Sequence, residues 1–227
     1  MRKALTTGVA VASLLTLGVT APVQAASHRC PVRTADVSVL HAVPNTPVDV
    51  YLDHKRILDD FQPGSLAGPL KVPGGTHTVR ITAATATNDH DPVIGPVKLK
   101  IVALRSYTVA AHLTAEGDPT ATLYRNPLKS TPHGKGRLVV RHVAAAPAVD
   151  VFANKVRTMK GLENPHQSKR DVKAGTYSVA VALAGTTAPV IGPADVEVKR
   201  HLDTIVYAWG SAKQGNLAVA VQTVKTR

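Results

Sequence analysis

Apolar and polar residues alternate along much of this 227-residue chain. Every second side chain is apolar in residues 36–40, 78–81 and 97–101, which is the period of a strand buried on one face. Turn-forming residues separate such segments, at residues 44–45, 63–64, 73–75, 88–89 and 117–119. Beyond residue 25 no segment has the spacing of an amphipathic helix. The pattern therefore predicts short strands joined by turns.

The same pattern occurs twice. The matching segments are residues 40–51 and 141–152, 75–79 and 175–179, and 92–96 and 189–193. A period of about 100 residues is the size of one small domain, so the chain is predicted to contain a duplicated domain. Each copy offers about seven short strands with regular turn signals, which is typical of a sandwich. The predicted fold is all-β: two tandem antiparallel β-sandwich (Ig-like) domains.

The start of the chain has the features of a cleaved signal peptide. Arg2 and Lys3 precede an apolar stretch at residues 8–19, and small residues at 23–25 suit cleavage after Ala25. The apolar stretch is short for a membrane anchor, so we expect a secreted, extracellular protein without a membrane span. The predicted organisation is a signal peptide (1–25), an unstructured tail (26–35), repeat one (36–126), a linker (127–136) and repeat two (137–227).

The chain has one cysteine, Cys30, in the predicted tail. A single cysteine cannot form a disulfide within the chain, so each core must be stable through packing alone. Cys30 could remain a free thiol or link two chains into a dimer. The expected cores are rich in valine and alanine, which bury little area each, so we expect the two repeats to pack on one another for added stability.

Charge divides unequally between the repeats. Residues 36–126 carry 8 basic and 9 acidic groups, whereas residues 137–227 carry 13 and 6, a net charge of +7. The basic residues that suggest a polyanion-binding surface are Lys155, Arg157, Lys160, Lys169, Arg170, Lys173, Lys199 and Arg200. Outside a cell such a surface attracts anionic polymers of the wall, although net charge can also serve solubility alone. Few aromatic residues are present to stack on bases, so no specific nucleic acid is expected.

The segments 39–44 and 47–53 resemble the opening of the bacterial family called domain of unknown function 4397, whose members look like "V-V-H-A-S-P-D-A-P-x-V-D-V-Y-V-D-G". Residues 70–76 and 103–109 fit later parts of that family, and the resemblance extends to both repeats. It implies β-sandwich modules that are secreted or lie at the surface, and it brings no established activity or catalytic residue. Ala148 and Asn154 depart from the pattern of the first repeat, and His54 departs from a frequent glycine of the family.

Two candidate chemistries follow from the residues. His41 and His142 each precede an aspartate, Asp49 and Asp150, by eight positions, so each pair could hold a catalytic base or a metal. The alternative is that histidine and aspartate each hold a turn through hydrogen bonds and recur because the module was copied. Residues 88–91 could supply oxygen ligands to calcium, but they lack the spacing of a dedicated calcium loop, which favours an ordinary hairpin loop.

The sequence contains no phosphate loop, nucleophile elbow or zinc-ligand spacing, so we expect no enzyme and no cofactor. We expect a secreted binding or scaffolding module of the cell envelope that contacts an anionic wall polymer through repeat two. The alternatives are a structural module that binds a surface protein and, less favoured, a hydrolase that uses a histidine–aspartate pair.

Overall fold

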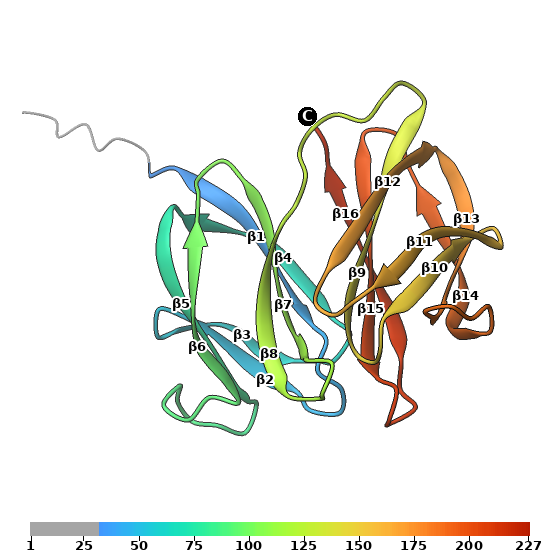
Figure 1. The fold of residues 1–227 in the computed structure, drawn as a ribbon. Coiled ribbons are helices and arrows are strands. Elements are labelled where there is room, and N and C mark those ends of the chain that lie inside the picture. The colour runs from blue at the N-terminus through green and yellow to red at the C-terminus, as the bar shows by residue number, and fades with distance from the viewer. Residues whose placement is uncertain (1–31) are drawn as a thin grey trace, which may run out of the picture. The chain divides into compact units, whose positions relative to one another are not determined.

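The computed structural model describes residues 32–227 (Figure 1). The predicted signal peptide and Cys30 lie outside the described residues. Among residues 32–227 the regular elements are all strands, and no helix has the length and apolar character to cross a membrane. The all-β prediction is confirmed.

The first module contains eight strands. They are β1 (Thr34–His41), β2 (Val48–Leu52), β3 (Lys55–Phe61), β4 (Leu66–Pro73), β5 (Gly75–Ala83), β6 (Ile94–Ile101), β7 (Ser106–Leu113) and β8 (Pro119–Arg125). One sheet has the order β4-β1-β7-β8 and the other the order β3-β2-β5-β6. β1 begins at Thr34, so the last two residues of the predicted tail belong to a sheet, where Ala35 is buried and lies opposite Val72.

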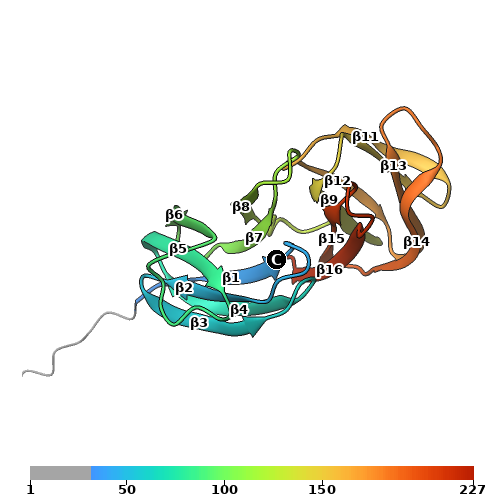
Figure 2. The ribbon, with the colours of Figure 1, turned by 90° about the horizontal axis from the view of Figure 1, so that it is seen from below.

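The second module repeats this arrangement. Its strands are β9 (Lys135–Ala145), β10 (Val149–Ala153), β11 (Val156–Leu162), β12 (Gln167–Lys173), β13 (Gly175–Leu183), β14 (Pro189–Val198), β15 (Leu202–Ser211) and β16 (Ala218–Lys225). The sheets have the orders β12-β9-β15-β16 and β11-β10-β13-β14 (Figures 1 and 2). β9 likewise takes the last two residues of the predicted linker.

Both modules are mainly antiparallel, with one parallel pair each. β1 pairs with β7 and β9 pairs with β15 in parallel, because the chain crosses to the other sheet and returns between these strands. The sequence predicted only antiparallel neighbours and about seven strands in each module. Alternation shows which face of a strand is buried, but it does not show which strand lies beside it.

Three clusters of buried apolar residues stabilise the fold of residues 32–227. One lies inside each sandwich and is formed largely by valines, such as Val37, Val50 and Val109 in the first module. The third joins the modules: Leu40 and Ala110 of the first contact Val139, Ile205 and Tyr207 of the second. The predicted contact between the repeats is therefore present, and it is made by the outward faces of the sheets that contain β1 and β9.

Candidate functional site

The repeated histidines are buried and bonded to backbone carbonyls. His41 Nε2 lies 2.8 Å from the carbonyl oxygen of Thr46, and His142 Nε2 lies 2.9 Å from that of Pro147. Burial lowers the pKa of both rings, and the carbonyl contact offsets this only in part. Each histidine thus holds the turn that joins the first two strands of its module.

The repeated aspartates are also buried, and they accept hydrogen bonds from backbone amides near the end of the next strand, β3 in the first module and β11 in the second. Asp49 Oδ1 accepts a bond of 3.0 Å from the amide of Asp60, and Arg56 donates to Oδ2 at 2.9 Å. Asp150 accepts from the amides of Gly161 and Gly185 at 2.8 and 3.0 Å. These backbone bonds lower the pKa of Asp150, and Arg157 at 3.2 Å adds to the effect.

The two histidine–aspartate pairs therefore have structural partners in both copies. Asn154 stands in the second module where the first has Asp53, and both side chains bond to backbone. Asp53 Oδ1 accepts a hydrogen bond of 2.8 Å from the amide of Thr78, and Asn154 Oδ1 accepts one of 2.9 Å from the amide of Ser178. The carboxylate oxygen of Asp53 and the amide oxygen of Asn154 thus accept the same backbone hydrogen bond in the two modules. In both modules these side chains bond to the backbone of their own module.

The loop at residues 88–91 is tied to the first module by Asp89. This carboxylate is buried and lies 2.8 Å from His54 Nδ1 and 3.6 Å from Arg80 Nη1. Within residues 32–227, no group of three or more histidine, cysteine or acidic side chains is placed to hold a metal. Asp89 is thus paired with His54 and Arg80 of its own module.

The predicted basic patch consists of the eight residues named from the sequence, and all eight are exposed. Lys155 precedes β11, which carries Arg157 and Lys160. Three others, Lys169, Arg170 and Lys173, lie on β12. β11 and β12 are edge strands of different sheets, and Arg170 Nε donates across to the carbonyl of Thr158 at 3.3 Å. The patch therefore follows one open side of the sandwich.

Lys199 and Arg200 lie in the turn between β14 and β15, and β14 is the edge strand opposite β11 in its sheet. The start of β9 approaches this turn so closely that a Cβ on Gly136 would lie 2.2 Å from the carbonyl oxygen of Lys199. Lys135 is next to Gly136 and pairs in register with Lys173. Lys135 thus joins the patch, although the sequence placed it in the linker.

Three residues of the patch have partners within the protein, so they are less available to bind an anionic ligand. Arg157 lies 3.2 Å from Asp150, Lys199 lies 3.0 Å from Glu197, and Arg170 bonds to a carbonyl. The remaining members have no carboxylate within 4.0 Å among residues 32–227; they are Lys135, Lys155, Lys160, Lys169, Lys173 and Arg200.

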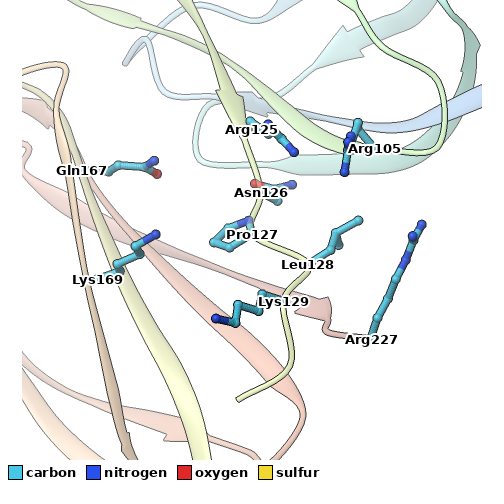
Figure 3. Close-up of a pocket in the computed structure, with 9 residues that line it drawn as sticks. All are labelled: Arg105, Arg125, Asn126, Pro127, Leu128, Lys129, Gln167, Lys169 and Arg227. Carbon is cyan, nitrogen blue, oxygen red and sulfur yellow. The ribbon is translucent and has the colours of Figure 1, made fainter. Parts of the chain in front are cut away.

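A second cationic feature is a groove of about 520 Å³ where the modules meet (Figure 3). We define the groove by its lining residues: Arg105, Arg125, Asn126, Pro127, Leu128, Lys129, Gln167, Lys169 and Arg227. Five of these side chains are cations, and none is a carboxylate. The sequence predicted only Lys169, because the other four cations lie far apart along the chain and only folding brings them together.

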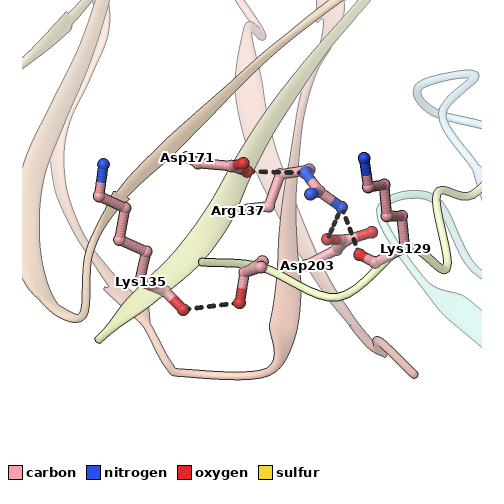
Figure 4. Close-up of polar contacts among 6 residues, drawn as sticks. Lys129, Lys135, Arg137, Asp171 and Asp203 are labelled. Carbon is pink, nitrogen blue, oxygen red and sulfur yellow. Dashed lines mark hydrogen bonds and ion pairs between the residues drawn. The ribbon is translucent and has the colours of Figure 1, made fainter. Parts of the chain in front are cut away.

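The linker wall of this groove is fixed by Arg137 (Figure 4). Its guanidinium donates to the carbonyl of Lys129 at 3.0 Å, to Asp203 at 3.2 Å and to Asp171 at 2.8 Å. Burial raises the pKa of Asp203 to about 6, and the charge of Arg137 only partly opposes that effect. The nearest acids are thus held by Arg137, outside the lining of the groove.

Arg141 lies fully buried behind the groove. It donates to the oxygens of two groove residues, Asn126 at 2.8 Å and Gln167 at 2.9 Å, and to the Tyr207 hydroxyl at 2.6 Å. Its guanidinium also lies 4.4 Å from the centre of the Tyr124 ring. Every one of these partners is neutral, and burial lowers the pKa of Arg141.

Comparison with known proteins gives a family and no activity. The model of the family described as Domain of unknown function (DUF4397) matches residues 35–152. This match covers the whole first module and the start of the second, so the chain belongs to that family. No curated protein matches the chain.

Proposed function

We propose that this protein is an exported module of the cell envelope that retains an anionic wall polymer through the basic surface of its second module. The observation that carries the proposal is the run of exposed cations along β11 and β12 that have no carboxylate partner among residues 32–227. Such a surface binds polyanions by releasing their counterions, so its affinity falls as salt rises.

The test is sedimentation of the protein with isolated cell walls, before and after removal of teichoic acid, across a salt series. The proposal expects binding that disappears with the polymer and weakens with salt. Binding that survives both treatments would overturn it and would favour a surface protein as the partner.

A charge-matched pair of variants locates the contact. The patch variant carries Lys155→Gln, Lys160→Gln and Lys173→Gln, and the control variant carries Lys55→Gln, Lys98→Gln and Lys100→Gln in the first module. Both lose three exposed charges, so their net charges are equal. The patch variant should lose more wall binding than the control, and equal losses would show that net charge alone is responsible.

A further inference from the structure

The groove where the modules meet gathers positive charge from three separate parts of the chain. Arg105 and Arg125 come from the first module, Lys129 from the linker, and Lys169 and Arg227 from the second module. Among residues 32–227 none of the five side chains forms an ion pair with a carboxylate of another residue within 4.0 Å. The five positive charges line one groove and repel one another. An anion that enters the groove reduces this repulsion and is therefore bound favourably.

Arg141 adds an independent observation. A fully buried guanidinium normally lies beside a carboxylate, because transfer of a charge out of water is costly. Here its bonds go to Asn126, Gln167 and Tyr207, which are neutral, and the first two line the groove. Asp203, whose charge raises the pKa of Arg141, is itself bonded to Arg137. A ligand anion in the groove supplies the missing countercharge through one layer of side chains.

The lining also indicates the chemical class of the anion. Three of the five cations are arginines, whose planar forks match the paired oxygens of phosphate groups and of carboxylates; the phosphate is the choice that follows from the proposed wall polymer. No aromatic side chain lines the groove, so it offers no platform for a base or a sugar ring. Figure 3 shows the Gln167 amide and the Lys169 amine pointing toward Asn126 and Pro127, so both walls present polar groups to one space.

We propose that the groove is the binding site for phosphate groups of an anionic polymer, and that the bound phosphate holds the two modules together. This proposal rests on the proposed function, and it adds to the contact made by the basic patch a site built from both modules. A volume of about 520 Å³ lies within the usual range for a ligand pocket and accommodates a phosphodiester with its neighbouring groups. Because the ligand contacts both modules only in the folded protein, its binding raises the unfolding temperature.

The experiment compares a groove variant, Arg105→Gln with Arg125→Gln, against the patch variant and against a matched control, Lys98→Gln with Lys100→Gln. Neither Arg105 nor Arg125 has a side-chain hydrogen bond or ion pair among residues 32–227, so the groove variant should keep its fold, which circular dichroism checks. Titration calorimetry measures binding of poly(glycerol phosphate), of inorganic pyrophosphate and of poly(glutamic acid) as a carboxylate polymer.

The groove variant should bind pyrophosphate and poly(glycerol phosphate) at least about tenfold more weakly than the control, as expected for lost charge-assisted hydrogen bonds. Pyrophosphate should also raise the unfolding temperature of the control and not of the groove variant. Equal affinities of the groove variant and the control would overturn the inference, as would equal binding of phosphate and carboxylate polymers.

The outcomes separate this inference from the proposed function. Loss of polymer binding only in the patch variant overturns the groove site and leaves the proposed function standing. Pyrophosphate binding that depends on Arg105 and Arg125, without any binding to cell walls, supports the groove site and overturns the proposed function.

Discussion

The two modules use the same strands and turns but differ at the positions where they meet. In both copies a buried histidine and a buried aspartate form hydrogen bonds with equivalent backbone groups. Counting from those histidines, Leu40 of β1 corresponds to Arg141 of β9, and the parallel partners of these residues are Ala110 and Tyr207. The first module thus brings a small apolar pair to the contact, and the second brings a large polar pair.

This difference shows which residues belong to the framework and which are particular to one copy. Features present in both modules bond to local backbone and fix turns. Features present in one module, such as Arg141 and the cations of β12, lie at the contact or on the surface. The copies therefore separate structural candidates from functional ones without any other sequence.

The largest expected loss of stability comes from substitution at Arg141, which corresponds to Leu40 in the first module. Arg141→Ala removes a fully buried side chain and leaves the Tyr207 hydroxyl and the Asn126 and Gln167 oxygens without their donor. It should lower the free energy of unfolding by about 3–5 kcal/mol, measured by urea denaturation. The equivalent Leu40→Ala should cost about 2–4 kcal/mol by loss of apolar contacts. A wild-type stability for Arg141→Ala would contradict the role given to this residue.

The matched aspartates should respond alike. Asp49→Ala frees the amide of Asp60, and Asp150→Ala frees the amides of Gly161 and Gly185. Each change removes a fully buried carboxylate together with its hydrogen bonds to backbone amides, so each should lower the unfolding temperature by several degrees. Differential scanning calorimetry of both variants measures the decrease. A large decrease in only one module would break the equivalence of the copies.

A smaller effect is expected where the first module has alanine and the second has glycine. Gly136 corresponds to Ala35, and a Cβ there would lie 2.2 Å from the carbonyl oxygen of Lys199. Gly136→Ala should therefore cost about 1–3 kcal/mol of unfolding free energy by overpacking. The reverse change, Ala35→Gly, should cost about 1 kcal/mol through chain entropy. Tolerance of Gly136→Ala would show that the turn between β14 and β15 moves aside.

The smallest expected effect is the change of folding stability with pH that the buried titratable groups cause. Burial lowers the pKa of His41, His112 and His142, so the unfolded chain binds more protons than the folded one below about pH 6.5. The stability due to these neutral rings is present above that pH and is lost on acidification. Asp203 acts in the opposite direction, because its pKa is raised to about 6 and the folded protein is relatively stabilised as the pH falls toward 4.

Asp203→Asn tests this opposition. Position 203 corresponds to Ser106 in the first module, so the first module has no such titrating group. The variant should lose more stability than the wild type between about pH 6 and about pH 4, measured by urea midpoints. Identical pH profiles for the two proteins would show that Asp203 does not titrate in this range.

The period-two pattern predicted most of the fold, because every second residue of a strand in a sandwich faces the core and is apolar. Val37 and Val39 face the core of the first sandwich, as their alternation indicates. The same pattern did not predict that β1 lies beside β7, since pairing depends on the path of the chain. Nor did it predict that Tyr207 lies between the modules, in the third cluster of buried residues.

The sequence by itself determined the strands, the turns, the duplication and the excess of positive charge in the second repeat, because each is a property of neighbouring residues or of composition. Only the tertiary structure decided that the outward faces of β1 and β9 cover one another, which buries Arg141. It also brought Arg105, Arg125, Lys129, Lys169 and Arg227 to one groove. The physical reason is that alternation specifies which side of a sheet a residue faces, whereas the surface that covers that side depends on how complete modules pack.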